Sequence, residues 1–562
     1  MTRMNLPSEP ENSASATDRA AELADLLQKY NMNRPAIGQL LRDDLVRFES
    51  FSDSDCGLLL DYSRCALNGQ TLGSLFDLAR ACELEDQRDR MFAGEAINVT
   101  ENRPVLHPLW RSRKFEDLLP AEEAANLQGA VERMGRIASA LRRGRLPGDD
   151  NARIRDVVHI GIGGSLLGPR LLVDAYSAGP GDGGDSRPPR IHFLSSVDPG
   201  PRESLLAELD PAATVIIVVS KSFTTSEVMS HAKALFAWQE HALDSAAAAP
   251  RRFAVTSRPD RAAEWSIPAE QVLEMGEWTG GRFSLWSPVG LTAAAAMGPE
   301  AFERLLEGGA AMDRHFRETP LEDNLPVIAA MLDVWQRNFC GFSSLAVIPY
   351  ESRLAELPGW LQQVAMESNG KRVTLERGAA KLATSPVIFG DCGTDAQHSF
   401  FQAFHQGTSV VPVDLIGVVN PGHSDAEASA SLLSHMLAQA TALARGRTEE
   451  EVREAMGAEG ASEEDIDRLA RHRVMPGDRP STVLMMDDFS PETLGALLVF
   501  YEHRVFVQSV IWGINAFDQW GVELGKTLAD AIEPAVANAD AEPPESLREL
   551  SGLLKHIHNT RD

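Results

Sequence analysis

The sequence predicts an α/β protein in which two units, each built on a parallel sheet, follow one another along the chain. Two series of short, β-branched apolar runs support this, the first between residues 157 and 257 and the second between 343 and 417. Each run is followed by glycine or small polar residues and then by a helical stretch, as in a parallel sheet wrapped by helices. The length of 562 residues agrees, because single hydrophobic cores stop growing at roughly 250 to 300 residues.

The order of elements follows from the local patterns. Residues 18–95 are expected to form amphipathic helices, because apolar residues recur there at three- and four-residue steps, and no strand is expected before about residue 155. The first series of strands comprises VVHIGIGG, RIHFLSSVD, ATVIIVVSKS and RRFAVTS, and the second comprises SSLAVIPY, SPVIFGD and SVVPVDLIG. The charged stretch 446–480 is expected to be a helical surface excursion, and 492–532 a final helical run, with another helix at the C-terminus.

Composition excludes several classes of function. The net charge of −28 opposes binding to nucleic acid or to anionic membranes, and no stretch approaches the ~18 apolar residues of a membrane span. The five cysteines are scattered, which favours neither a disulfide framework nor a zinc site. The N-terminus lacks the basic flank and apolar run of a secretion signal, so we expect a soluble cytoplasmic protein.

Two strand-to-helix turns carry groups that suit a phosphate. In HIGIGGSLLGPRLL, a buried strand ends in glycines and Ser165, so that backbone N–H groups and a hydroxyl converge where an anion would sit. A plain tight turn is the alternative; a dinucleotide site is disfavoured because the spacing is not GxGxxG. The second turn, 220–225 (SKSFTT), places five potential donors in six residues, whereas one serine or threonine suffices as a helix cap.

These turns resemble the GIGGS and SKTFTT turns of the glucose-6-phosphate isomerase family. The resemblance extends over most of the chain, through GEAINVTENRPVLH, GGRFSLWSPVGL, MESNGK, GTDAQHSFFQAFHQGT and FVQSVIWGINAFDQWGVELGK. It implies two α-β-α sandwich domains of the sugar-isomerase type with parallel sheets. The smaller domain would comprise 126–295, and the larger would comprise 1–125 and 296–562, including N-terminal helices and a C-terminal helical arm.

The resemblance also implies an activity and its binding residues. The family interconverts glucose 6-phosphate and fructose 6-phosphate through ring opening and a cis-enediolate, in glycolysis and gluconeogenesis, without metal or organic cofactor. The residues that would bind the substrate and its phosphate are Gly164, Ser165, Ser220, Lys221 (by its amide), Ser222, Thr225, Glu227, Gly281 and Gln519.

Glu367 and Arg282 are the residues to which the resemblance assigns the proton transfer. Moving a hydron between two carbons needs one base, and the resemblance gives this role to Glu367 in MESNGK. On local sequence alone, a glutamate at the end of a helical run is more often a solvated surface residue. Arg282 would stabilise the charge on the enediolate, although it could simply be a surface arginine after a glycine turn.

His398 and Lys526 resemble the ring-opening pair of the family. His398 precedes His405 by seven residues, so both are expected on one helical face, where a packed core histidine is the alternative. No metal is expected, because no ligand accompanies the pair at a familiar spacing. The resemblance implies that His398 reaches into the partner subunit's site, so that a homodimer is required. Asp395 departs from the family pattern and could alter the hydrogen bonding of His398.

Two rival functions stay open at this point. An isomerase of the same fold could act on another hexose phosphate, such as mannose 6-phosphate. A non-catalytic sugar-phosphate sensor would keep the phosphate turns and lose the proton-transfer groups, yet all four catalytic positions carry the expected residues.

Overall fold

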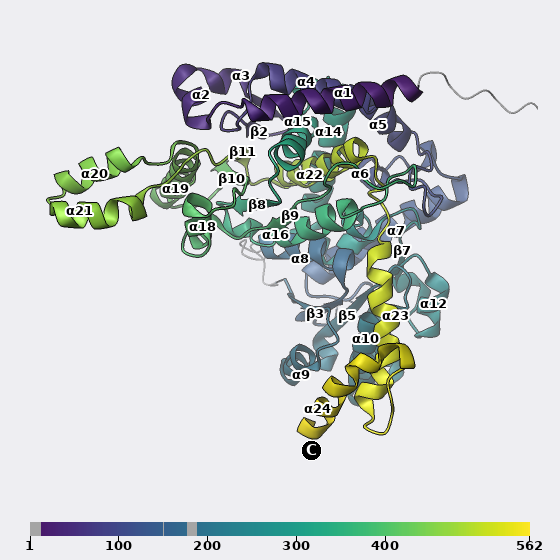
Figure 1. Ribbon diagram of the computed structural model, residues 1–562. Helices are drawn as coiled ribbons and strands as arrows, with labels where there is room; N and C mark the ends of the chain where they lie inside the picture. Colours follow the sequence, from purple (N-terminus) through teal and green to yellow (C-terminus); the bar gives the residue numbers. More distant parts are fainter. Residues whose placement is uncertain (1–12, 150, 177–187, 562) are drawn as a thin grey trace, which may run out of the picture. The chain divides into compact units, whose positions relative to one another are not determined.

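The protein is described by a computed structural model, which covers residues 13–149, 151–176 and 188–561 (Figure 1). The contacts between residues divide the chain into two units, of which the first ends at Ala516 and the second comprises Phe517–Asp562. Both sheets belong to the first unit, as expected for an α/β protein. The boundaries at 126 and 295 stay a prediction.

The first sheet has five strands in the order β4-β3-β5-β6-β7, and all neighbours are parallel. Its strands are β3 Asp156–Ile160, β4 Arg190–Leu194, β5 Thr214–Val219, β6 Arg252–Thr256 and β7 Val272–Glu274. The four predicted runs are therefore confirmed, and β7 is an addition. Because β4 and β5 lie on opposite sides of β3, the chain reverses its direction of winding between β3 and β5. Ligands of open parallel sheets bind at the carboxyl ends of the strands at such a point.

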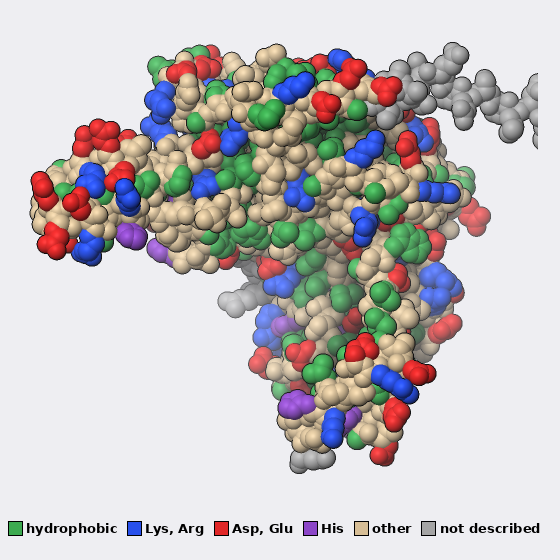
Figure 2. All heavy atoms as spheres, in the orientation of Figure 1, with side chains coloured by type: hydrophobic (Ala, Val, Ile, Leu, Met, Phe, Trp, Pro, Cys, Tyr) green, Lys and Arg blue, Asp and Glu red, His purple; other side chains and the backbone are tan. Residues whose placement is uncertain are grey.

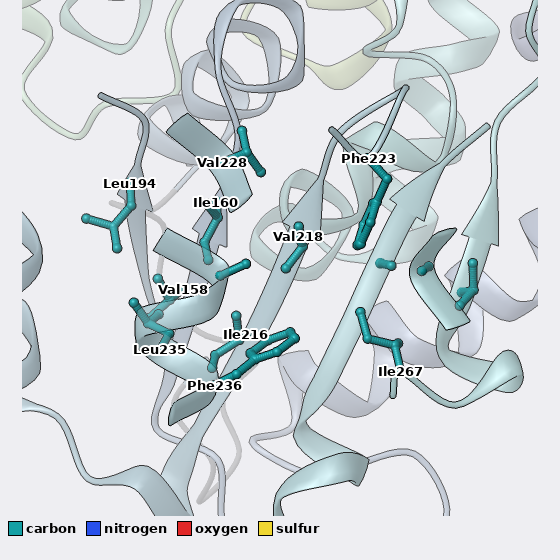
Figure 3. Close-up of a cluster of buried hydrophobic side chains, with 14 of the residues drawn as sticks. Val158, Ile160, Leu194, Ile216, Val218, Phe223, Val228, Leu235, Phe236 and Ile267 are labelled. Carbon is teal, nitrogen blue, oxygen red and sulfur yellow. The ribbon is translucent and has the colours of Figure 1, made fainter. Parts of the chain in front are cut away.

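The core of this sheet explains why its strands were recognisable from sequence. β5 is buried along its whole length and consists entirely of β-branched residues. Figure 3 shows strand residues such as Val158, Ile216 and Val218 packing against Leu235 and Phe236 of α10. The helices that follow these strands are α8 Leu167–Tyr176, α9 Pro199–Glu208, α10 Ser226–Ala242, α11 Ser245–Ala248 and α12 Pro259–Glu264.

The second sheet has six strands in the order β1-β2-β11-β10-β8-β9. They are β1 Ser52–Asp55, β2 Leu58–Asp61, β8 Ser344–Pro349, β9 Val387–Phe389, β10 Val413–Asn420 and β11 Ser481–Asp488. The three predicted runs form β8, β9 and β10, and neighbours among β8–β11 are parallel.

The hairpin β1–β2 corrects two expectations: strands do occur before residue 155, and this sheet is not parallel throughout. β2 is antiparallel to β11, and β1 is antiparallel to β2. The turn consists of Cys56 and Gly57, whose φ angles of 53° and 74° both lie in the left-handed region. Two consecutive residues of this kind match the twist of a tight hairpin. β11 was also missed from the sequence.

The first unit also contains helices that lie outside the two strand series in the sequence. They are α1 Ser13–Met32, α2 Ile37–Asp43, α3 Arg47–Ser50, α4 Gly69–Ala81, α5 Leu84–Phe92, α6 Pro108–Ser112, α7 Ala121–Arg142, α13 Leu291–Met297, α14 Pro299–Glu318 and α15 Leu325–Val334. α22 (Pro491–Trp512) packs against α14 and α15. It is the one described helix long and apolar enough to cross a membrane, and 94% of its apolar window is buried inside the protein.

Close packing between α14 and α22 depends on glycine. A β-carbon at Gly308 would overlap the backbone of Glu492, and one at Gly495 would overlap the carbonyl of Leu305. The two helix backbones therefore approach each other at positions where any side chain would force them apart. This contact fixes the helix whose C-terminal half supports the candidate site.

The second strand series carries the remaining helices of the first unit. They are α16 Leu357–Leu361, α17 Gly393–Gln397, α18 Phe401–Gln406, α19 Ala426–Arg445, α20 Glu449–Ala458 and α21 Glu463–Leu469. The helical prediction for 446–480 is confirmed by α20 and α21, which enclose a small core of Val452, Met456 and Ala470. Acidic and basic side chains are mixed over these two helices (Figure 2).

The predicted helical run 492–532 is interrupted. α22 ends at Trp512, and Gly513 follows in the left-handed region with φ 62°. A glycine in this conformation is a common helix stop. The second unit, described by itself, contains α23 Glu523–Ala537 and α24 Ser551–Arg561.

Candidate active site

A pocket of about 310 Å³ lies at the carboxyl ends of β3 and β5, where the winding of the first sheet reverses. It is lined by five of the residues predicted to hold a phosphate, namely Ser165, Ser220, Lys221, Ser222 and Thr225. The structure therefore brings both predicted turns together in one cavity. Hydroxyl groups dominate this part of the lining, and they suit an anion that accepts several hydrogen bonds.

The turn after β3 is held by a buried histidine that sequence reasoning missed. His159 Nε2 lies 2.7 Å from the carbonyl oxygen of Ser165, and Nδ1 lies 2.9 Å from Thr292 Oγ1. Since a carbonyl can only accept, Nε2 carries the proton and Nδ1 accepts from the threonine hydroxyl. Burial lowers the pKa of His159 to about 4, so the ring is neutral at neutral pH. Gly163, with φ 57°, allows the turn between them.

The turn after β5 is organised by its own hydroxyl groups. Ser220 is buried, and its Oγ accepts from the Phe223 amide at 3.1 Å and lies 3.3 Å from Thr225 Oγ1. Phe223 has a left-handed φ of 52°, which turns its ring into the core of the sheet (Figure 3). Thr225 occupies the N-cap of α10 without a side-chain capping bond. Its hydroxyl is therefore not used by the helix and lines the pocket.

The side chain of Lys221 points to backbone carbonyls and links this turn to the next. Its Nζ donates to the carbonyl oxygens of Glu277 at 2.6 Å and Thr279 at 3.0 Å. Burial, with the Arg103 guanidinium nearby, lowers the pKa of Lys221 to about 8. The structure thus ties the phosphate turn to the residues directly before Gly280-Gly281-Arg282.

The glycine-arginine turn lies directly against the first phosphate turn. A β-carbon at Gly164 would overlap the carbonyl of Gly281, so only glycine fits at this contact. Arg282 is only 3% exposed, which excludes the surface-arginine alternative. Its Nε donates to Ser368 Oγ at 2.6 Å, and its Nη2 donates to the carbonyl of Ala516.

Glu367 lies opposite Arg282 at the end of a π-helix, Gln362–Glu367. The distance from Arg282 Nη1 to Glu367 Oε2 is 3.4 Å, and the carboxylate side chain is 23% exposed. Gln363 donates to the same Oε2 at 2.9 Å. Single π-helical turns are often found at functional sites. The surface-residue alternative for Glu367 therefore fails, because its carboxylate has two defined partners.

The residues after Glu367 explain the rest of the MESNGK segment. Ser368 and Asn369 are fully buried, and Asn369 donates to the Val505 carbonyl and to Gln508 Oε1 of α22, both at 3.0 Å. Lys371 Nζ donates to the carbonyls of Glu367 and Ser368, each at 2.8 Å. A lysine that meets the last carbonyls of a helical segment stabilises its C-terminus. These bonds hold the Glu367 backbone.

His398 is placed apart from this group. It follows α17 as an exposed residue, and the contacts described for it do not include Glu367 or Arg282. The expected shared helical face with His405 is wrong, because α17 ends at Gln397 and His405 belongs to α18. Residues 398–400 are not helical and separate α17 from α18. The carbonyl oxygen of Asp395 accepts a hydrogen bond from the backbone N–H of His398 at 3.0 Å.

Three further predicted residues lie outside the pocket lining. Glu227, in the first turn of α10, accepts a hydrogen bond from the Ser226 hydroxyl at 3.0 Å. Lys526 and Gln519 belong to the second unit, where Lys526 is 64% exposed and lies 3.6 Å from Glu523. The sugar-binding and ring-opening roles of these three residues stay predictions.

The pocket also contains residues that sequence reasoning did not select. Ser257, Arg258 and Arg261 follow β6 and line the cavity beside the turn after β5. The signal was present, since β6 was predicted and the carboxyl ends of adjacent parallel strands meet at one edge of the sheet. No group of three or more His, Cys, Asp or Glu residues suited to a metal occurs among the described residues.

Comparisons with known proteins agree with this arrangement. The family model described as phosphoglucose isomerase matches residues 61–545. The chain is 45% identical to glucose-6-phosphate isomerase of Xanthobacter autotrophicus over 91% of this chain and 93% of that protein. It is 41% identical to the enzyme of the same name from Brucella anthropi, over 97% and 99% of the two chains.

A solved structure extends the likeness to the fold. The crystal structure of a glucose-6-phosphate isomerase from Chlamydia trachomatis has a TM-score of 0.81 and 33% identity, and covers 96% of this chain and 99% of that chain. A family match and relatives of this extent leave one assignment, and the chain belongs to the phosphoglucose isomerase family.

Proposed function

We infer that this chain is an aldose-ketose isomerase that interconverts glucose 6-phosphate and fructose 6-phosphate. Family membership and the names of the relatives support the reaction. The observation that carries it in this chain is the pair of Glu367 and Arg282, 3.4 Å apart, beside a hydroxyl-lined pocket. A base, a fixed positive charge and an anion pocket are what the reaction needs.

We propose that the phosphate of the substrate binds in the pocket, among Ser165, Ser220, Ser222 and Thr225. The sugar then extends across the Gly164–Gly281 contact toward Glu367. Gly281 has open space where a β-carbon would lie, so a ligand can approach its backbone closely. Binding energy from the phosphate, which does not react, holds the reacting carbons in place.

We propose that Glu367 removes the proton from C2 of the open-chain aldose and returns it to C1. The electron pair of the broken C–H bond forms the C1–C2 double bond of the enediolate, while the carbonyl electrons move to O1. The Arg282 guanidinium faces this negative charge, and Ser368 and Ala516 hold it in place. The hydroxyl proton of O2 is lost as O1 gains one, which completes the isomerisation.

We further propose that His398 and Lys526 open the sugar ring. The exposure of His398 in a single chain favours the expectation that it serves the partner subunit's site in a homodimer. Lys526 would supply the second proton-transfer group. The proposal also keeps a cytoplasmic location and includes no metal or organic cofactor, because a carboxylate suffices for the proton transfer.

The experiment that tests the function is an NMR assay of the purified chain with fructose 6-phosphate. We expect glucose 6-phosphate as the main product. Mannose 6-phosphate as the main product would assign the chain to the rival isomerase. Binding of fructose 6-phosphate without any product would instead support the sensor.

A further inference from the structure

The hydroxyl groups of the phosphate pocket do not supply the positive charge that would balance a bound phosphate. A sugar phosphate carries close to two negative charges at neutral pH, while the whole protein has a net charge of −28. Serine and threonine hydroxyls donate hydrogen bonds but supply no charge. The charged residues that line the pocket are Lys221, Arg258, Arg261 and Glu277.

Two of the three cations are already committed to other groups. Lys221 directs its ammonium group to the carbonyls of Glu277 and Thr279. Arg258 forms a two-pronged pair with Asp260, with Nε–Oδ1 at 3.0 Å and Nη2–Oδ2 at 2.6 Å. The charge of Arg258 is therefore balanced by a carboxylate two residues away.

Arg261 differs from Arg258 because its partner is a carbonyl and not a carboxylate. It differs from Lys221 because a carbonyl uses one of its five N–H donors, whereas carbonyls use two of the three donors of Lys221. Its Nη1 donates to the carbonyl oxygen of Ser222 at 2.7 Å, and it forms no ion pair with a carboxylate in the described part of the chain. A carbonyl accepts a hydrogen bond without neutralising the guanidinium. One nitrogen of the planar Arg261 guanidinium is thus fixed on the phosphate turn. The positive charge of the guanidinium remains available to an anion in the cavity, which Arg261 lines.

The contact with Ser222 continues a pattern along the same turn. The carbonyl oxygen of Lys221 accepts from the Thr256 hydroxyl at 3.0 Å and from the Ser257 hydroxyl at 2.9 Å. Residues at the end of β6 and after it therefore bind two successive carbonyls of the turn. Carbonyl oxygens repel a phosphate, so holding them on these donors leaves the hydroxyls to face the cavity.

We propose that Arg261 is a further substrate-binding residue, which fixes the Ser220–Thr225 turn through the Ser222 carbonyl and supplies the positive charge that faces the substrate phosphate. This inference rests on the proposed function. It adds a residue of α12, the helix that follows β6, to a pocket otherwise assigned to the turns after β3 and β5.

The test compares Arg261→Gln with Arg258→Gln as a matched control. We expect Arg261→Gln to raise KM for fructose 6-phosphate about ten- to one-hundred-fold, as for loss of a hydrogen bond to a charged group, with kcat within about three-fold. Arg258→Gln should raise KM less than about three-fold, because Asp260 already balances that arginine. Arg261→Lys retains the charge and should give an intermediate KM.

Inhibition by inorganic phosphate separates a direct role from a structural one. If Arg261 faces the substrate phosphate, Arg261→Gln should raise the inhibition constant of inorganic phosphate in parallel with KM. The same variant should show a weaker dependence of KM on salt concentration. An unchanged KM, an unchanged inhibition constant, or equal effects of the two glutamine variants would overturn the proposal. Wild-type activity is measured first, since its absence would contradict the function rather than the role of Arg261.

Discussion

The pocket beside the five-stranded sheet and the segment that carries His398 differ in how much of their surroundings one chain supplies. Ser220 and Arg282 are each 3% exposed and have defined partners within the chain. His398 is exposed, and its backbone N–H donates to the carbonyls of Asp395 and Ala396. The difference supports our proposal that one chain organises phosphate binding and proton transfer, whereas His398 serves the site of a partner subunit.

The largest effect is expected within the self-contained region. Glu367→Gln preserves the size of the side chain but removes the base, so kcat should fall by ~100- to 10,000-fold. Substrate binding, measured by calorimetry with fructose 6-phosphate, should be nearly unchanged because the phosphate pocket is intact. Glu376→Gln, on an exposed residue nearby, is the control. A residual kcat within ten-fold of wild type would remove Glu367 as the base.

Mixing two inactive variants tests whether His398 acts in the site of the partner subunit. If His398 acts in the partner subunit's site, a mixed dimer of Glu367→Gln and His398→Asn chains contains one site with both natural residues. Co-refolded or co-expressed chains should then recover activity, up to about half of wild type per mixed dimer. If His398 acts within its own chain, mixing recovers nothing, and size measurements by light scattering show whether mixed dimers formed. If His398 does not act at all, the His398→Asn chain is active before mixing.

A smaller effect is expected for the phosphate turn. Ser220→Ala removes a buried hydroxyl that lines the pocket, so KM for fructose 6-phosphate should rise about ten-fold while kcat changes little. Ser230→Ala, on the exposed side of α10, is the matched control. Equal KM values for the two variants would show that the phosphate binds elsewhere.

The smallest effect concerns stability and pH. Burial lowers the pKa of His159 to about 4, so the unfolded chain binds a proton near pH 6.5 that the folded chain rejects. The free energy of unfolding therefore falls by up to about 3 kcal/mol, through this histidine, as the pH falls from 6.5 to 4. His159→Gln should weaken that dependence in urea unfolding at pH 7 and pH 5, whereas the exposed control His398→Asn should retain it.

The strands that the sequence predicted are those whose burial is visible in their composition. β5 and β3 are buried along their whole length and rich in valine and isoleucine, so they were recognised with their turns. β7 has only three residues, and β11 follows a charged segment and ends in two aspartates, so neither stood out. The β1–β2 hairpin was missed because its pairing with β11 is a tertiary contact that no local period records.

The site shows the same limit. Ser165, Ser220 and Thr225 were found because hydroxyls gather at strand ends, where parallel sheets bind ligands. His159 was not, since within β3 it looks like any core residue, and its role depends on the distant Thr292. Arg261 was also missed although β6 was predicted, because what distinguishes it from Arg258 is the partner of each guanidinium, a carbonyl for Arg261 and a carboxylate for Arg258.

The central claim is that one carboxylate moves a proton between adjacent carbons of a phosphate-anchored sugar. Incubation with fructose 6-phosphate in deuterated water, followed by NMR, tests it most directly. The wild-type chain should produce glucose 6-phosphate that carries deuterium at C2, and Glu367→Gln should produce neither product nor label. Isomerisation with no exchange at all, or equal labelling by the variant, would contradict the assignment of Glu367.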